Sequence, residues 1–83
     1  MKPNAEEYYN PSREYFSRLI YALKENYYSM SEISRKVGVS RATLYNHLRE
    51  ESDPRYRIHP YTLQYALEKL LENSKVPHLR NIS

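Results

Sequence analysis

The sequence predicts an all-α fold, a small bundle of four to five helices, from three observations. Glycine occurs once among 83 residues, whereas β-rich domains need glycine at many of their turns. Apolar residues recur at helical spacing in the first half of the chain and again after Pro60. Serine, proline and the one glycine stand where those helices would begin or end. A chain of this length is expected to form one domain.

The first helix is expected at about residues 11–26, after an N-terminal arm over residues 1–10. Asn10 is a favourable N-cap, and Pro11 suits the first helical position, where its missing N–H is not needed. The apolar residues of this segment form one helical stripe that would face the core: Tyr15, Phe16, Leu19, Ile20, Leu23 and Tyr27.

A short second helix is expected at about residues 30–37, and both of its ends carry local signals. Ser29 and Glu32 match the S-x-x-E capping box, in which the serine side chain and the glutamate side chain cap each other's backbone N–H groups. Gly38 would end this helix, because glycine adopts a positive φ without steric cost.

The third helix is expected at about residues 41–51, with Ser40 as its N-cap and Leu44 and Leu48 facing the core. A polar loop over residues 52–59 follows.

Pro60 would begin a fourth helix, over residues 60–73, with the most strongly amphipathic pattern of the chain. Its apolar stripe consists of Leu63, Leu67, Leu70 and Leu71, with Ala66 beside it. Residues 74–83, which contain Pro77, would form a C-terminal tail outside the helix.

Residues 30–50 have the pattern of a helix-turn-helix motif, in which two short helices cross steeply and need a tight turn. Ser34 is small at the point where the two helices would approach each other most closely. Five apolar residues would fix the helices to the core: Ile33, Val37, Val39, Leu44 and Leu48. Because such motifs place the N-terminal part of the second helix in the major groove, the sequence predicts double-stranded DNA as the partner.

Five residues of the third helix would face outward and are predicted to contact bases: Arg41, Ala42, Tyr45, Asn46 and Arg49. Arginine pairs bidentately with guanine and asparagine with adenine, while alanine contacts the thymine methyl group. Tyr45 would contact that methyl group or bind a phosphate. The alternative for the two arginines is an ordinary solvated charge.

A second set of residues is predicted to contact phosphates: Ser29, Ser31, Arg35, Lys36, Ser40, Arg55, Tyr56 and Arg57. The serines stand at helix N-termini, whose free N–H groups bind phosphate. For residues 55–57 a solvated loop is an equally good interpretation. The net charge of +3 and the isoelectric point of about 9.2 fit a nucleic-acid partner.

The composition argues against several other classes of protein. Cysteine is absent, and the three histidines have no metal-ligand spacing, so no metal site is expected. One glycine cannot form a nucleotide-binding loop, and no catalytic residue, cofactor or small-molecule ligand is predicted. No apolar run is long enough to span a membrane, which predicts a soluble, intracellular protein.

Two functional alternatives remain beside a repressor. Helix-turn-helix folds also bind proteins, so the chain could be an antitoxin or an inhibitor. Arg41, Asn46 and Arg49 on the outward face, with no acidic residue before Glu50, favour DNA instead. An activator or a recombination accessory protein is the second alternative. Since the sequence shows no second domain for a ligand or a polymerase contact, occlusion of a promoter is the simplest mechanism.

The segment from Tyr15 to Asn73 resembles the anti-CRISPR-associated proteins, which are small helix-turn-helix repressors of phages and mobile elements. The resemblance is clearest in HPYTLQYALE, residues 59–68, which is similar to the start of the corresponding helix in that family. Family members carry paired arginines at the start of the second helix, where this chain has Ser31 and Glu32. The operator sequence is therefore not expected to be shared.

The resemblance implies a two-fold homodimer in the cytoplasm of a bacterial host. It would bind an inverted-repeat operator and silence its own operon. It also implies that the fourth helix and the N-terminal segment form the dimer interface. The helix has more apolar residues than one small core needs, which agrees with this. The expected interface residues are Tyr61, Leu63, Tyr65, Leu67, Leu70 and Leu71.

Overall fold

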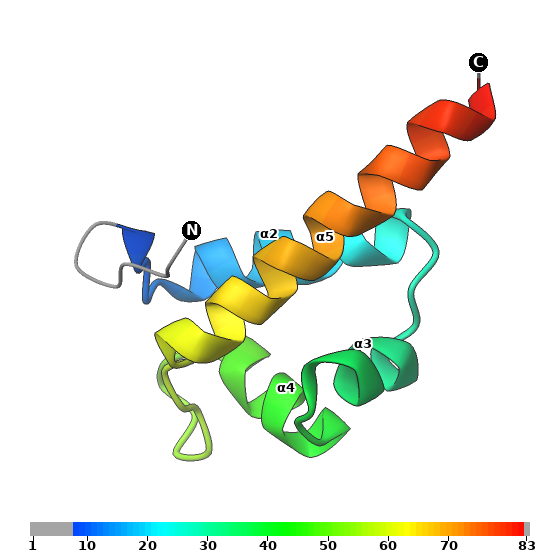
Figure 1. Cartoon of the computed structure of the whole chain (residues 1–83). Coiled ribbons are helices and arrows are strands. Elements are labelled where there is room, and N and C mark those ends of the chain that lie inside the picture. The colour runs from blue at the N-terminus through cyan, green and yellow to red at the C-terminus, as the bar shows by residue number, and fades with distance from the viewer. Residues whose placement is uncertain (1–7, 83) are drawn as a thin grey trace.

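The computed structural model describes residues 8–82, and the side chains of residues 8–74. This part of the chain contains four helices and no strand, which confirms the all-α fold: α2 (Arg13–Glu25), α3 (Met30–Val37), α4 (Arg41–Leu48) and α5 (Tyr61–Ile82). Both α2 and α3 contact α4 and α5. The C-terminal end of α5 extends beyond the other three helices (Figure 1).

One apolar core lies where the four helices meet. Its buried residues come from every helix: Phe16, Leu19, Ile20, Leu23, Met30, Ile33, Leu44, Leu63 and Leu67. Val37, Val39 and Leu48 are partly buried against this core, as are Leu70 and Leu71. The helical spacing of apolar residues in the sequence therefore identified most of the core correctly.

The first described helix begins two residues later than expected. Ser12, not Asn10, is the N-cap of α2, and its Oγ accepts a hydrogen bond from the Tyr15 N–H at 3.1 Å. Asn10 Oδ1 instead accepts from the Ser12 N–H at 3.0 Å, which shapes the turn before the helix. Pro11 consequently lies outside the helix. The predicted arm over residues 1–10 lies largely outside the described residues.

The end of α2 corrects one predicted core residue. Tyr27 lies beyond the C-cap Asn26 in the left-handed region, at φ 73°, and its side chain is 87% exposed. The Tyr28 N–H donates to the Leu23 carbonyl at 3.1 Å, and the Tyr27 N–H donates to the Lys24 carbonyl at 2.9 Å. These are the two bonds of a Schellman motif, so the chain reverses before Tyr27 can continue the apolar stripe.

The last helix continues to Ile82, beyond the predicted end at residue 73. Proline inside a helix removes one backbone hydrogen bond, and Pro77 therefore predicts a helix end before this position. The rest of the backbone ladder stays available on both sides of the proline, and α5 continues through this position. Among the described residues, no helix is long and apolar enough to cross a membrane.

Candidate nucleic-acid interface

The caps that the sequence predicts are present at both ends of α3 and at the start of α4. Glu32 N–H donates to Ser29 Oγ at 3.1 Å and Ser29 N–H donates to Glu32 Oε1 at 2.9 Å, which completes the capping box. This bond from the Ser29 backbone lowers the pKa of Glu32 below its ordinary value. Gly38 ends α3 in the left-handed conformation at φ 78°. Ser40 caps α4, where its Oγ accepts from the Thr43 N–H at 3.1 Å.

Ser34 has a second role in this turn besides its small size. Its hydroxyl donates to the carbonyl of Val39, and its own carbonyl accepts from the Val39 N–H at 3.2 Å. These two bonds connect the last turn of α3 to Val39, the residue after Gly38. The turn is therefore fixed by a side chain as well as by the glycine.

The N-terminal half of α4 forms an open, cationic surface. Arg41, Ala42 and Tyr45 are exposed, and α4 contains no acidic residue. The Arg41 guanidinium donates to Ser31 Oγ at 3.3 Å, so the N-terminal ends of α3 and α4 lie close together. These three of the five residues predicted to contact bases are accessible to a partner.

The other two residues of the predicted base-contacting set are bonded within the protein. Asn46 and Arg49 are half-buried. Arg49 Nε donates to Asn46 Oδ1 at 2.9 Å, and Arg49 Nη1 lies 3.6 Å from Asp53 Oδ2. A bidentate contact of Asn46 with adenine needs this same oxygen, so it would require Arg49 to release it.

Arg13 of α2 binds the backbone at the point where α4 ends. The sequence predicted a helix to about residue 51, but α4 stops at Leu48 and Arg49 is extended at φ −66° and ψ 160°. Arg13 Nε donates to the Leu48 carbonyl at 3.0 Å and to the Arg49 carbonyl at 2.7 Å. A charged donor thus satisfies carbonyls at the helix end. No local pattern could have shown this, since the contact spans 35 residues.

The predicted phosphate-contacting residues of the two short helices are accessible. Ser29, Ser31 and Ser40 are exposed at or beside the N-terminal ends of α3 and α4. Arg35 and Lys36 are exposed in the last turn of α3. These five residues belong to α3 or cap α3 and α4, and one of them, Ser31, contacts Arg41 directly.

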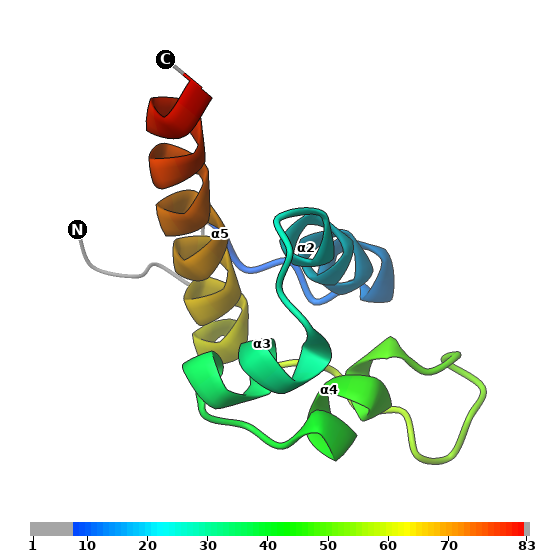
Figure 2. The same cartoon turned by 90° about the vertical axis from the view of Figure 1, so that its right-hand side faces the viewer.

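The loop after α4 projects from the bundle, as the yellow-green segment in Figure 2 shows. Arg55 Nη2 lies 3.2 Å from Asp53 Oδ2, and the Arg57 guanidinium donates to the carbonyls of Pro54 and Tyr56 at 2.9 and 2.8 Å. Tyr56 is half-buried, and burial raises the pKa of its hydroxyl. The backbone N–H of Arg55 lowers the pKa of Asp53. These basic side chains already have partners within the loop.

The predicted dimer residues divide into two groups in the structure. Leu63 and Leu67 are 4% and 0% exposed in the core of the single chain. The prediction that these two leucines lie in a dimer interface is wrong, because a partner could reach them only by opening the core. The remaining members are half-buried: Tyr61, Tyr65, Leu70 and Leu71.

A pair of buried histidines, one in α4 and one in the loop before α5, joins the core, although the sequence pattern did not predict this. His47 is 6% exposed and His59 is 1% exposed. Phe16 packs against both rings, with centroid distances of 5.3 and 4.9 Å, and the two imidazoles are 6.3 Å apart. His47 Nδ1 lies 2.7 Å from the Arg57 carbonyl. Burial lowers the pKa of His59. Within the described residues, no group of three or more histidines and carboxylates is placed to hold a metal ion.

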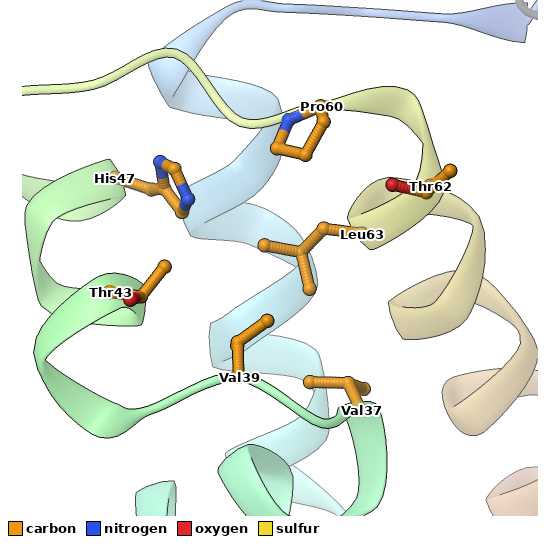
Figure 3. A pocket seen from close by; sticks show the side chains of 7 residues that line it. All are labelled: Val37, Val39, Thr43, His47, Pro60, Thr62 and Leu63. Atoms are coloured by element: carbon orange, nitrogen blue, oxygen red, sulfur yellow. The ribbon is translucent and has the colours of Figure 1, made fainter.

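A small hollow of about 190 Å³ separates α4 from the start of α5. Figure 3 shows the ring of His47 and the side chain of Leu63 facing each other across it, with Val37 at the end of α3 and Val39 in the turn below. The hollow lies on the core side of α4. It therefore does not interrupt the exposed surface described above.

One comparison with known proteins, that with family models, agrees with this geometry. Residues 17–50 match the family model described as bacterial regulatory protein, arsR family. The matched segment contains most of α2 and all of α3 and α4. No curated protein and no solved structure matches the chain. The matched segment and the fold together support a small helix-turn-helix transcription regulator that binds DNA, with a domain similar to that of the arsR family.

Proposed function

We propose that this chain is a sequence-specific transcriptional repressor that binds an inverted-repeat operator as a homodimer. It would autoregulate an anti-CRISPR-type operon of a phage or mobile element in the cytoplasm of a bacterial host. The observation that carries the DNA-binding part is the open surface on α4, where Arg41, Ala42 and Tyr45 are exposed beside the capped end of α3. This is the part of a recognition helix that enters the major groove.

In this proposal, the three exposed residues of α4 contact base edges directly. Arg41 is the strongest candidate because a guanidinium can donate two parallel hydrogen bonds to guanine. Its single bond to the Ser31 hydroxyl, at 3.3 Å, is long and exposed, so DNA can replace it. Ser29, Ser40 and the basic residues of α3 would bind the flanking phosphates.

The dimer would form through half-buried residues of α5, which include Tyr61, Tyr65, Leu70 and Leu71. A domain this small benefits from the apolar area that a second copy would cover. The two recognition helices would then lie about 34 Å apart, one turn of DNA, which is why an inverted repeat is expected. Bound at a promoter, the dimer would exclude RNA polymerase.

The first experiment is a gel shift with the purified chain and the DNA upstream of its own gene, at near-physiological salt with excess competitor DNA. A competitor-resistant complex of two subunits is the expected result. A footprint without two-fold symmetry would contradict the dimeric operator. Failure to bind any duplex would contradict DNA binding and favour a protein partner, which a pull-down would then identify.

Arg41→Ala tests the proposed role of the exposed surface. The substitution is expected to weaken operator binding by about 1–3 kcal/mol and to relax the preference at one base pair. Arg18→Ala is the matched control, because it removes the same charge from an exposed position on α2. An equal loss for both variants would show that only total charge matters. A loss that is equal for every sequence would make Arg41 a phosphate contact.

A further inference from the structure

Asp53 lies between two arginines that the sequence predicts to contact DNA, Arg49 and Arg55. Its Oδ2 is 3.6 Å from Arg49 Nη1 and 3.2 Å from Arg55 Nη2. Its Oδ1 accepts from the Arg55 backbone N–H at 2.8 Å, which fixes the carboxylate in the loop. The Asp53 side chain is only 23% exposed, whereas that of Arg55 is 66% exposed. One carboxylate therefore pairs with two cations, one directly after α4 and one in the loop, and offsets half of their combined charge.

Arg49 belongs to the same helix face as the open surface. Positions 41, 42, 45, 46 and 49 follow the spacing of one helical stripe, although Arg49 is the residue directly after the helix. Its carbonyl accepts from Arg13 Nε at 2.7 Å, and its Nε donates to Asn46 Oδ1 at 2.9 Å. Backbone and side chain of Arg49 are thus both fixed by neighbours before any partner binds.

This arrangement affects phosphates and bases differently. A phosphate attracts an arginine through its charge, and a carboxylate already beside the arginine weakens that attraction. Guanine offers two neutral acceptors and is recognised by hydrogen-bond geometry. Arg49 retains free N–H donors on its terminal nitrogens, since a guanidinium has five. An arginine that is fixed in place also loses less side-chain entropy when it binds.

We propose that Asp53 is a specificity-determining residue, which suppresses sequence-independent phosphate binding by Arg49 and Arg55 and orients Arg49 for a base contact. This inference rests on the proposed function, because it assigns a role at the same DNA-binding surface. It explains why a chain with a basic loop would still distinguish its operator from other DNA. Asp53 acts through the arginines and is a positioning residue.

The test compares wild type, Asp53→Asn and Glu51→Gln on two duplexes over a salt series, by fluorescence anisotropy. One duplex is enriched from a randomised library by the wild-type chain, and the other is its scrambled version. Asp53→Asn keeps an oxygen that can accept from the Arg55 N–H, so the loop can keep its turn. Glu51→Gln is the matched control, because it changes the charge equally at an exposed position in the same loop.

Asp53→Asn is expected to bind the scrambled duplex more tightly than Glu51→Gln does, by roughly 5- to 10-fold at 0.1 M salt for each arginine released. The slope of log K against log salt should steepen by about 0.9 per released arginine. The preference for the enriched duplex should fall correspondingly. A purely structural role of Asp53 would lower the melting temperature without steepening this slope.

A second pair of variants guards against indirect effects of the loop. In an Arg49→Gln background, Asp53→Asn should lose part of its effect on the scrambled duplex, because one of the two cations is absent. Equal binding of Asp53→Asn and Glu51→Gln to the scrambled duplex would overturn the inference while DNA binding stands. Absence of binding by wild type and both variants, even at low salt, would overturn the proposed function and this inference with it.

Discussion

The α3–α4 unit and the junction between the N-terminal segment and α5 are stabilised in different ways. In the α3–α4 unit, the caps and turn bonds join residues three to five positions apart, as between Ser29 and Glu32 and between Ser34 and Val39. At the junction, Gln64 Oε1 accepts from the Asn10 N–H at 2.9 Å, across 54 residues. The first kind of contact can be inferred from a short stretch of sequence, and the second cannot.

The junction is a buried polar network, which the local unit lacks. Gln64 is 0% exposed, and its Nε2 donates to the Tyr8 carbonyl at 2.8 Å and to Glu68 Oε2 at 3.1 Å. The Tyr15 hydroxyl also donates to Glu68, and burial together with this bond raises the pKa of Tyr15 to about 12. Buried polar groups are expensive to leave unpaired, whereas an exposed cap can exchange its bond for water.

The comparison teaches that the residues most visible in the sequence are not those whose loss should cost most. Caps and turn glycines contribute about 1 kcal/mol each. Substitution of a buried apolar or polar residue of α5 should cost several times more free energy of unfolding, because no water can replace its partners. Three substitutions test this order, beginning with the largest expected effect.

Leu67→Asp should unfold the chain. Leu67 is 0% exposed. The free-energy cost of burying an unpaired carboxylate at this position would exceed the free energy of unfolding of a domain of this size. Circular dichroism and thermal unfolding measure the effect. Leu70→Asp is the comparison, since Leu70 is half-buried: it should keep the helical signal and, if the proposed dimer forms through α5, reduce the mass in solution to that of a monomer. A folded Leu67→Asp variant would contradict the assignment of this residue to the core.

Gln64→Ala should lower the free energy of unfolding by about 2–4 kcal/mol, because the Asn10 N–H and the Tyr8 carbonyl both lose a partner. Urea denaturation measures the loss. Thr62→Ala, at an exposed position two residues earlier, is the control and should change stability by about 0.5 kcal/mol or less. Equal stability of the two variants would show that the network adds nothing to the junction.

Gly38→Ala should have the smallest effect, about 1–2 kcal/mol, from the left-handed backbone alone. A Cβ at this position would meet no atom within 4 Å, so no steric clash adds to the cost. Gly38→Asn should cost less, because asparagine tolerates this conformation better. Denaturation midpoints give both values. A loss above that of Gln64→Ala would reverse the proposed order of local and long-range contacts.

The prediction of the fold succeeded where a signal is local. The bounds of α3, the capping box and the left-handed Gly38 are confirmed, and so is the cap Ser40. Local signals also misled at the two ends of α2: Ser12 caps this helix in place of Asn10, and a Schellman motif without glycine exposes Tyr27. The prediction failed as well at the end of α4, where Arg13 binds the backbone.

The candidate site likewise contains residues whose exposure helical spacing predicts and residues whose contacts depend on the tertiary structure. The exposed positions 41, 42 and 45 followed from helical spacing, because Leu44 fixes which face of α4 points inward. The engagement of Arg49 with Asn46 and Asp53 did not follow from spacing, since it depends on where the helix ends and how the loop returns. Leu63 and Leu67 share a stripe with Leu70, and only the tertiary packing separated core from surface.

The sequence by itself determined the helical class, the two short helices with their caps, and the outward face of α4. Each of these depends on backbone geometry and side-chain bonds within about one helical turn. The tertiary structure alone decided the buried polar network of Gln64, the role of Arg13 at the end of α4, and which arginines are already paired. The physical reason is that these contacts join residues brought together only when the apolar core closes, so no local pattern encodes them.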